Sequence, residues 1–474
     1  MKRRQFIGAC ALPFLATRTG NLLSAQRMVP AGAAIDLSTG VFRRRFTGFG
    51  GETPLWGYNG TTPGPLLRFR RGETVTIDVA NSLPESTTVH WHGVRVPHAM
   101  DGVPHITQPP IKPGERFRYQ FAVPDSGTYW YHPHHRSFEQ VGRGLFGGLI
   151  VEEEKPIEVD RDVAWLIADL LLDPASGAHA PFGRISEHAA EGRLGNLITI
   201  NGEVSGPDHF MDVRAGERIR MRLINAATAR VFRLRFDRHV PTVIAYDGQA
   251  ITPHVPDGST ILLGPGMRAD LVIDCEGRPG ERFAIDDAVS GKVLATLRYR
   301  DEDMLRSRLR GAPLQLARNE LPVPNLKKPT THTIEFRGGS YGPPAIGMVD
   351  GKAIPLHEMQ NKHGLAWTVN SHALAEDAHE VAPLLTLKQG STHVINMING
   401  TGFVHPMHLH GHFFRVLDYN GVKPKHEEWR DTVFMHPWDE VTIAVVAGEP
   451  GDWMFHCHIL EHAAAGMMGV IRVE

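Results

Sequence analysis

A frame that begins with glycine and ends with asparagine nine positions later occurs three times in this chain of 474 residues. The copies are residues 72–81, 216–225 and 390–399. In the first copy apolar residues alternate with polar ones across residues 75–79, and a period of two is typical of a half-buried β-strand. A repeat of this kind indicates one structural unit used several times, so it outweighs any local assignment. The chain therefore predicts three copies of one β-rich unit.

Turn residues support the same interpretation. An asparagine that suits a tight turn precedes each copy, at Asn59, Asn201 and Asn370. With 49 glycines and 34 prolines, and with strand patterns outnumbering helical ones, the composition favours β-sandwiches over an α/β architecture. Short strands at regular spacing, repeated threefold, predict an all-β chain of three Greek-key β-sandwich domains.

The domain boundaries follow from the repeat and from one linker. Residues 301–330 are charged and then rich in proline, as linkers are. The predicted domains are residues 27–154, residues 155–305, and residues 306–474, the last including the linker. Residues 177–195 are expected to hold a short helix, and residues 338–362, which have no clear period, are expected to be loops.

Residues 1–26 have the features of a signal peptide. Arg3 and Arg4 form a basic start, an apolar run covers residues 7–16, and small residues follow. The apolar run is too short for stable membrane insertion. Paired arginines resemble a twin-arginine signal, which predicts the twin-arginine export machinery as a partner and a periplasmic or secreted location. Cys10 also fits a lipoprotein box, but this box precedes the apolar core that it should end.

Net charge and cysteine content narrow the possibilities further. A formal charge of −2 gives no electrostatic reason to expect nucleic acid or an anionic membrane surface as a partner. Besides Cys10, which leaves with the signal, the cysteines are Cys275 and Cys457. Only these two could form a disulfide, and none remains if Cys457 binds metal. Cys275 is expected to be an ordinary buried strand residue.

The richest cluster of metal-binding side chains lies at the C-terminus. It comprises His456, Cys457, His458, His462 and Met467. Thiolate, imidazole and thioether are ligands that select copper, and a cysteine with histidines and a weak thioether describes a blue electron-transfer site. On a strand the two histidines that flank Cys457 point to the face opposite the cysteine. We therefore expect one copper on one side of this strand and further metal on the other.

Three more histidine clusters occur upstream. They are His90 with His92, His132 with His134, and His405 with His408 and His410. Residues 127–134 and 451–458 share one frame, in which a glycine stands five positions before a His-x-His pair, and the middle repeat has no such cluster. The middle unit is therefore expected to space and orient the outer two. Eight imidazoles from the outer units suffice for three copper ions, whereas structural zinc would need only four closed ligands.

These motifs resemble the three-domain multicopper oxidases, the family of laccases and copper efflux oxidases, over nearly the whole mature chain. The resemblance implies cupredoxin-like domains and four copper ions. It implies that His405, Cys457 and His462 hold type 1 copper with Met467 as axial ligand, and that His90 and His408 hold type 2 copper. It implies that the type 3 pair is held by His92, His132, His134, His410, His456 and His458.

The family resemblance also implies a reaction and its candidate catalytic residues. Donors give single electrons to type 1 copper, Cys457 passes them on, and dioxygen is reduced to water. Asp101 matches a carboxylate near type 2 copper and is expected to serve proton transfer, although Asp-Gly is also a turn signal. Many bacterial members have an acidic residue where this chain has Ala463. Glu461, two positions earlier, is the remaining candidate, and its carboxylate could face elsewhere.

The identity of the donor is the most open question. Soft thioethers attract Cu(I), and residues 301–380 hold only three, at Met304, Met348 and Met359. Their scarcity favours phenolic or similar donors, which need mainly an exposed edge of a type 1 histidine. The alternatives are a cuprous oxidase in copper tolerance and a copper-free envelope scaffold, which would be expected to lose ligands. Copper nitrite reductases share the sandwich but lack the eight-histidine cluster.

Overall fold

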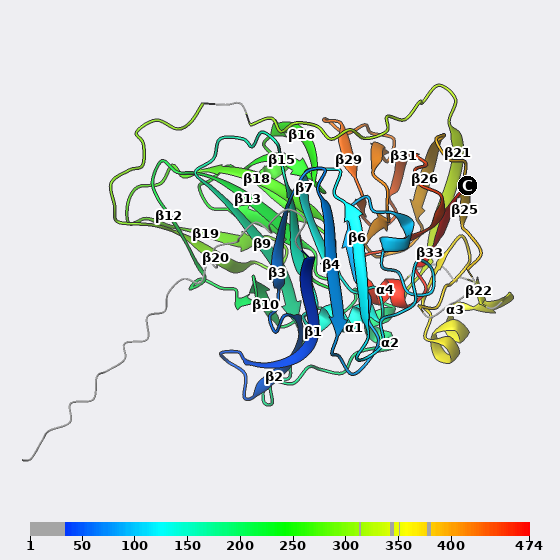
Figure 1. Ribbon diagram of the computed structural model, residues 1–474. Coiled ribbons are helices and arrows are strands. Elements are labelled where there is room, and N and C mark those ends of the chain that lie inside the picture. The colour runs from blue at the N-terminus through cyan, green and yellow to red at the C-terminus, as the bar shows by residue number, and fades with distance from the viewer. Residues whose placement is uncertain (1–33, 312–313, 342–345, 350, 377–380) are drawn as a thin grey trace, which may run out of the picture.

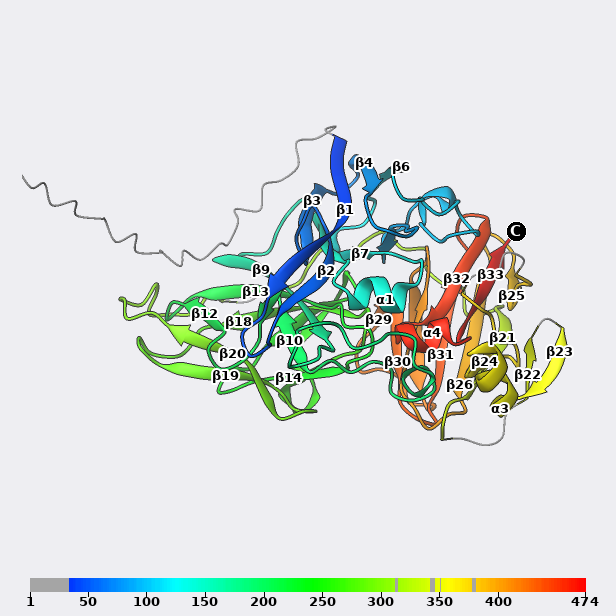
Figure 2. The ribbon, with the colours of Figure 1, turned by 90° about the horizontal axis from the view of Figure 1, so that it is seen from below.

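The computed structural model describes residues 34–311, 314–341, 346–349, 351–376 and 381–474. The predicted signal peptide and Cys10 lie outside the described residues. The chain forms three successive β-rich units, which run from blue through green to red in Figures 1 and 2. Among the described residues, no helix is long and apolar enough to cross a membrane.

The first unit is a pair of four-stranded sheets. Its strands are β1 (Ala34–Arg45), β2 (Glu52–Tyr58), β3 (Gly64–Arg70), β4 (Thr74–Asn81), β5 (His90–His92), β6 (Arg116–Ala122), β7 (Gly127–His132) and β8 (Gly147–Glu152). The sheet orders are β2-β1-β4-β6 and β3-β8-β7-β5. Val75, Ile77 and Val79 of β4 are buried against Trp91 and Tyr131 of the other sheet. The alternation predicted for β4 therefore faces the core of a sandwich.

The second unit is a larger sandwich. Its strands are β9 (Arg161–Leu170), β10 (Leu197–Ile200), β11 (Glu203–Val204), β12 (Phe210–Val213), β13 (Arg218–Asn225), β14 (Phe232–Phe236), β15 (Thr242–Tyr246), β16 (Gln249–His254), β17 (Thr260–Leu263), β18 (Arg268–Asp274), β19 (Arg282–Asp287) and β20 (Lys292–Tyr299). The sheet orders are β11-β10-β9-β13-β18-β15-β16 and β12-β20-β19-β14-β17. Cys275 is buried in the core between these sheets and is free, as predicted.

The third unit carries the C-terminal cluster. Its strands are β21 (Thr330–Gly338), β22 (Ile346–Val349), β23 (Lys352–Pro355), β24 (Trp367–Val369), β25 (Leu385–Leu387), β26 (Thr392–Asn399), β27 (His405–Leu409), β28 (Phe414–Tyr419), β29 (Glu428–Arg430), β30 (Thr432–Met435), β31 (Glu440–Val446), β32 (Gly451–Cys457) and β33 (Met468–Val473). The two main sheets have the orders β24-β21-β26-β31-β28-β29 and β25-β33-β32-β27-β30. Every sheet draws its strands from one unit only.

The α-helices of the described residues are short. They are α1 (Ser137–Gly142), α2 (Ile185–His188), α3 (Leu356–Glu358) and α4 (Leu460–Ala464). The helix expected within residues 177–195 is confirmed by α2. The expectation of loops across residues 338–362 is wrong, because β22 and β23 pair as a hairpin and α3 continues into a π-turn at Met359–His363. Strands of four residues are too short to give a clear period of two.

The threefold repeat is a repeat of structure. Its copies form β4, β13 and β26, each of which pairs in parallel with the first strand of its own unit. The glycine before each strand has a positive φ of 73–78°, which favours glycine. The asparagine that ends each strand donates from its side-chain amide to two backbone carbonyl oxygens later in the chain; the three residues are Asn81, Asn225 and Asn399. Each copy thus anchors a strand at both ends.

The three units contact one another in pairs. Strand β7 of the first unit lies against β13 and β18 of the second, β16 of the second lies against β29 of the third, and α1 lies against α4. Figure 2 shows the first and second units beside the third, which carries β32 and α4. The histidine strands of the outer units therefore meet with the middle unit alongside.

Candidate metal centre

Two strand pairs present the histidines in the same way. In the first unit β5 pairs antiparallel with β7, so that His90 lies opposite His132. In the third unit β27 pairs antiparallel with β32, so that His408 lies opposite His456. The glycine-to-histidine frame shared by residues 127–134 and 451–458 is therefore one local structure used twice. Each unit offers the other a surface of imidazoles.

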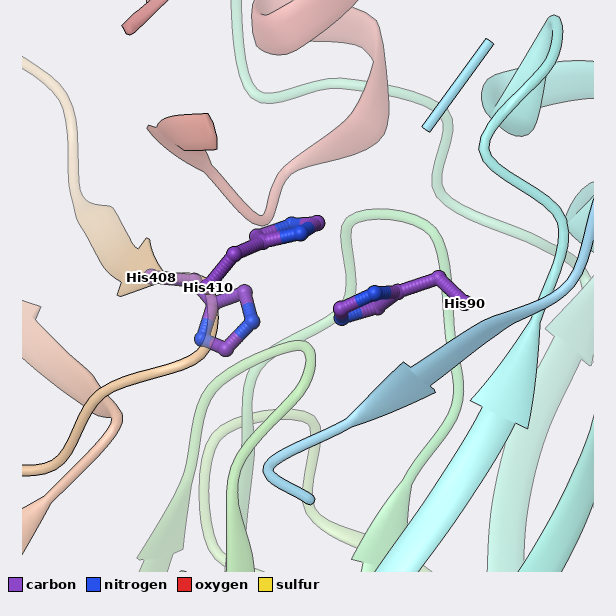
Figure 3. Close-up of side chains that lie close together, drawn as sticks. All are labelled: His90, His408 and His410. Atoms are coloured by element: carbon purple, nitrogen blue, oxygen red, sulfur yellow. The ribbon is translucent and has the colours of Figure 1, made fainter. Parts of the chain in front are cut away.

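Imidazoles from both outer units converge on shared points. The Nε2 atom of His456 lies 3.3 Å from that of His134 and 3.1 Å from that of His410. Figure 3 shows His90 extending toward His408 and His410 from the facing strand. Three sets of three imidazoles have ligand atoms within 4.8 Å of one another: His90, His408 and His410; His90, His92 and His132; and His134, His410 and His456. Such sets suit imidazole-binding metals.

His458 completes the group. Its ring centroid lies 4.9 Å from that of His92 and 5.3 Å from that of His132. All eight histidines of the first and third units that were predicted to hold three copper ions are brought together and are buried.

The free nitrogens of these rings test whether metal fits. Among the described residues, five of the eight rings have a buried nitrogen without a hydrogen-bond partner: His90 Nε2, His92 Nδ1, His132 Nε2, His408 Nε2 and both nitrogens of His458. A buried polar atom without a partner is costly and rare in a folded protein. A cluster of them on facing imidazoles is accounted for when one nitrogen of each ring donates its lone pair to a metal ion.

Asp101 accepts hydrogen bonds from the Nδ1 atoms of two of these rings. Its backbone carbonyl oxygen accepts a hydrogen bond from His90 Nδ1 at 2.8 Å, and its Oδ2 accepts one from His410 Nδ1 at 2.8 Å. The residue is completely buried. Because each Nδ1 donates, each Nε2 is left with its lone pair directed into the cluster. Asp101 thus lies where the sequence predicted a carboxylate.

Backbone carbonyls orient three further rings. His132 Nδ1 donates to Pro133 at 3.0 Å, and His456 Nδ1 donates to Cys457 at 2.8 Å. His408 Nδ1 donates to the carbonyl oxygen of Asp431 at 2.9 Å. Asp431 was missed in the sequence, because a single aspartate between two short strands carries no spacing signal. Its neighbours in the fold identify it.

A second site lies on the other side of β32. The Sγ atom of Cys457 is 3.6 Å from His405 Nδ1 and 3.7 Å from His462 Nδ1, and the two Nδ1 atoms are 3.1 Å apart. All three side chains are completely buried. This arrangement matches the trigonal N,N,S site of blue copper proteins. It also confirms that His456 and His458 face away from the cysteine.

Met467 lies close to this site in the chain and in the core. Its backbone carbonyl oxygen accepts a hydrogen bond from the Cys457 amide at 3.0 Å, and its amide donates to the His462 carbonyl at 2.9 Å. Its side chain is buried in the same apolar core as Cys457. The main chain thereby ties the methionine to both a cysteine and a histidine of the site.

Burial sets the protonation of the candidate ligands. Burial lowers the pKa of His134, His410 and His456 well below the ordinary histidine value, and neighbouring imidazoles lower it further. Neutral imidazole is the form that binds metal. Burial also raises the pKa of the Cys457 thiol well above its ordinary value. A thiolate at this position requires a bound cation, since a coordinating thiol is deprotonated by its metal.

The edge of His462 is covered, contrary to the expectation of an exposed histidine edge at this site. Neither His405 nor His462 is exposed. The Nε2 atom of His462 donates to the carbonyl oxygen of Ala190 at 2.6 Å. The ring of Trp367 lies 4.3 Å from that of His462, and its Nε1 donates to the carbonyl oxygen of His188. The middle unit, through the segment after α2, therefore covers the site.

Glu461 is buried on α4 and belongs to none of the sets of close ligand atoms. Its Oε2 is so near Gly192 of the middle unit that a Cβ there would lie 3.1 Å from it. Burial raises the pKa of Glu461 to about 7. Ala463 is buried against Met454 and Met468. The carboxylate of Glu461 therefore faces the middle unit, the outcome that the sequence left open.

A three-unit β-sandwich protein with a buried Cys-His-His site and an adjoining cluster of eight imidazoles has the architecture of a blue copper oxidase. Three family models described as multicopper oxidase match residues 43–156, 183–300 and 351–474. The chain belongs to the multicopper oxidase family. It is therefore an oxidoreductase that passes electrons from a donor to dioxygen, and the family implies four copper ions of types 1, 2 and 3.

Known relatives support this membership. A crystal structure of a multi-copper oxidase from Pseudomonas thermotolerans is 32% identical with a TM-score of 0.81, covering 93% of this chain and 99% of that one. Laccase-2 of Fomitopsis schrenkii is 30% identical over 87% of this chain and 84% of its own length. Copper resistance protein A of Escherichia coli is 25% identical over 94% and 93%. The predicted cupredoxin-like fold is confirmed.

Proposed function

We propose that this multicopper oxidase takes its electrons from phenolic or similar small organic donors, as a laccase does, and works in the periplasm or outside the cell. The observation that carries the choice of donor is the scarcity of methionine between residues 301 and 380, where Met348 is half-buried. Met359, one of three methionines between residues 301 and 380, is completely buried, and Met304 lies in the linker. Oxidation of Cu(I), which prefers thioether ligands, is the second candidate. A relative named copper resistance protein A supports it.

Electrons enter through His462 and the segment that covers it. Ala190 is half-buried, so its outer face is the surface nearest the hydrogen bond between its carbonyl oxygen and His462 Nε2. A donor resting on this surface needs no direct contact with the imidazole. Such a loose requirement suits a range of planar one-electron donors.

Twelve side chains are assigned to the coppers. We assign His405, Cys457, His462 and Met467 to type 1 copper, His90 and His408 to type 2 copper, and His92, His132, His134, His410, His456 and His458 to the type 3 pair. The unpartnered ring nitrogens and the short distances between ring nitrogens support this assignment. Copper, when bound, supplies the one-electron redox chemistry and the reduction of dioxygen.

Cys457 connects the two sites through the protein itself. It is bonded along the chain to His456 and His458, and His456 Nδ1 donates to the Cys457 carbonyl oxygen at 2.8 Å. Covalent bonds and one hydrogen bond therefore lead from the sulfur to two imidazoles of the cluster. This short path supports Cys457 as the electron relay.

Protons are needed for every dioxygen reduced, and Asp101 is the first candidate to handle them. Its carboxylate touches His410, and its backbone touches His90, so it adjoins rings assigned to two types of copper. We propose that Asp101 both orients these rings and moves protons at its Oδ atoms. Glu461 is the weaker candidate, because its carboxylate lies beside Gly192 in the middle unit.

A second carboxylate lies at a small cavity beside the cluster. The cavity, about 10 Å³ in volume and thus room for a single water, is lined by His134, Glu376, Met454 and Met468 among others. Ala463, which stands where many family members have an acidic residue, packs against the same two methionines. We propose that Glu376, whose carboxylate accepts a hydrogen bond from the Ser137 amide at 3.0 Å, supplies protons in its place.

We also propose the domain limits and the export route. Domains at residues 27–154, 155–305 and 306–474 are supported by the fact that every sheet lies within one of these ranges. The paired Arg3 and Arg4 support export by the twin-arginine machinery. A copper-free scaffold is disfavoured, because the histidines and the cysteine of the proposed sites converge in two buried groups.

Oxygen uptake by the copper-loaded protein tests the donor. A methoxyphenol is supplied as the sole reductant in one experiment, and Cu(I) in another. Fast uptake with the phenol, at four donors per dioxygen, is the expected result. Uptake with Cu(I) alone would replace the proposal by a cuprous oxidase. No uptake with either donor, in protein that holds its coppers, would exclude both.

A further inference from the structure

A buried arginine of the middle unit reaches the histidine cluster formed by the outer two. Arg268 begins β18 and is completely buried. Its Nη1 donates to Asp431 Oδ1 at 2.7 Å, and its Nη2 donates to Asp431 Oδ2 at 2.5 Å. This is the two-pronged pairing of guanidinium and carboxylate that fixes geometry as well as supplying energy. The position of the Asp431 carboxylate is therefore set by the middle unit.

Asp431 in turn touches two rings of the cluster. Its backbone carbonyl oxygen accepts a hydrogen bond from His408 Nδ1 at 2.9 Å, and its Oδ1 lies 3.3 Å from His92 Nε2. Thr432 strengthens the arrangement, since its hydroxyl donates to Asp431 Oδ1 at 2.8 Å and lies 3.2 Å from His92 Nε2. A carboxylate can only accept, so His92 Nε2 carries the hydrogen.

This contact decides which nitrogen His92 offers to metal. With the hydrogen on Nε2, the lone pair lies on Nδ1, the atom of His92 that has no hydrogen-bond partner. One ring nitrogen of His92 lies within 4.8 Å of ligand atoms of His90 and His132. His90, His132, His408 and His410 do the opposite, because their Nδ1 atoms donate, to a backbone carbonyl oxygen or to the carboxylate of Asp101, and their Nε2 atoms face the cluster. His92 thus depends on the carboxylate of Asp431, and Arg268 holds that carboxylate.

The remaining donors of Arg268 join all three units. Its Nε donates to the carbonyl oxygen of Thr128 on β7 in the first unit, and its Nη2 donates to that of Asp247 in the second. Asp431 belongs to the third. A lysine has one ammonium group and no planar fork, so it could not make these contacts together.

One glycine leaves room for this contact, and a second leaves room for a ring of the cluster. Gly93, directly after His92, has a φ of +83°, and a Cβ there would lie 2.2 Å from Arg268 Nη2 and 2.5 Å from Asp431 Oδ2. Gly266, in the turn before β18, would bring a Cβ within 2.6 Å of the His458 ring. The backbone of the first unit therefore packs closely on the pair, and that of the middle unit packs closely on His458.

We propose that Arg268 is a positioning residue of the copper cluster. Through Asp431 it sets the ring orientation and the tautomer of His92 and the orientation of His408, so that the middle unit controls a site to which it gives no ligand. This inference rests on the proposed assignment of His92 and His408 as copper ligands. It gives the middle unit a specific part in the spacing and orienting role that the sequence predicted for it.

The test compares Arg268→Met and Arg268→Lys with Arg220→Met. Arg220 is a matched control, because it is also a buried arginine of the middle unit, and it donates to Glu153 and Asp270, which are not among the proposed copper ligands. The measurements are total copper, copper retained against a competing chelator, the blue absorption of type 1 copper and the electron paramagnetic resonance spectrum of type 2 copper.

Both Arg268 variants are expected to keep the blue absorption while cluster copper is held roughly 10- to 100-fold more weakly and the type 2 spectrum changes, the usual effect of losing the partner of a ligand. Arg220→Met is expected to keep wild-type spectra even if it unfolds at a lower temperature. If Arg268→Met does not fold, Arg268→Lys, which keeps a cation, is decisive.

Wild-type spectra and retention in both Arg268 variants would overturn the proposal, as would the same losses in Arg220→Met. Wild-type protein without type 1 or type 2 signals would instead overturn the ligand assignment. The spectra of the wild-type protein alone therefore distinguish failure of the ligand assignment from failure of the proposed role of Arg268.

Discussion

The Nε2 atom of His462 lies 2.6 Å from the carbonyl oxygen of Ala190 and donates a hydrogen bond to it. The contact joins the third unit to the middle unit at the proposed site of electron entry. Because both histidines of the Cys457 site are completely buried, a donor reaches them only through what covers them. Access to this site is thus a property of the interface between two units.

Replacing Ala190 with tryptophan is expected to weaken the oxidation of bulky phenols. The large side chain would separate the donor from His462, and kcat/KM should fall roughly tenfold, equivalent to about 1.4 kcal/mol. The carbonyl oxygen, the copper content and the blue absorption should be retained. Val204→Trp, at an exposed position of the same unit, is the control and should keep wild-type rates. Equal rates in both variants would mean that electrons enter elsewhere.

Cys457→Ser is expected to abolish the blue absorption and the oxidase activity together. A hydroxyl does not replace the thiolate of a blue copper site, and the path from the sulfur to His456 is lost. Absorption spectra and oxygen uptake are the measurements. Cys275→Ala, in the core of the middle unit, should leave both unchanged. Turnover in the serine variant would remove Cys457 from the electron path.

Asp101→Asn is expected to slow the reduction of dioxygen roughly 10- to 100-fold, the usual cost of altering the partner of a metal ligand. The substitution removes a charge and weakens the hydrogen bond to His410 Nδ1, while the Cys457 site is untouched. The blue absorption should therefore persist, and its reoxidation by oxygen should be slow. Reoxidation at the wild-type rate would exclude Asp101 from proton handling and from positioning.

Glu376→Gln is expected to slow reoxidation by oxygen as well, because it removes the proton-carrying group at the cavity beside His134. The double variant Glu376→Gln, Ala463→Glu should recover part of the rate, since it restores an acidic residue near the same cavity. Rapid-mixing measurements of reoxidation compare the two. Reoxidation of the single variant at the wild-type rate would contradict the role of Glu376. No recovery of the rate in the double variant would also contradict it.

Copper removal is expected to make the protein sensitive to acid. Burial lowers the pKa of His132, His134 and His410 well below 6.5 and that of His462 to about 3. In the unfolded chain these rings take up protons below pH 6.5, but in the folded apoprotein they stay neutral. Each ring thus contributes stability that is present above pH 6.5 and is lost as the pH falls, at up to about 1.4 kcal/mol per unit.

Thermal unfolding of the apoprotein between pH 8 and pH 5 measures this effect. The midpoint should fall steadily below pH 6.5, whereas the copper-loaded protein should keep its midpoint to lower pH, because bound metal holds the imidazoles neutral. A flat apoprotein curve would show that the rings titrate freely when folded.

Much of the fold could be predicted because its signals are local. The alternation around Ile77 and the glycine and asparagine at the ends of each repeat depend on neighbours in sequence. The hairpin of β22 and β23 was missed because strands of four residues carry little periodicity. The cover over His462 was missed for another reason. Ala190 carries no chemical signal, since its contribution is a backbone carbonyl oxygen that any residue has.

The sequence by itself determined the proposed ligand set and the repeated sandwich. These features are patterns of residue types: the histidine spacing, one cysteine among histidines and a threefold frame. Residue types decide which metal is favoured and which strands pair. The tertiary structure alone decided how the set is used. Arg268 meets Asp431, and His462 meets Ala190, only because three units pack together, and contacts between positions far apart in the chain depend on that packing rather than on local sequence.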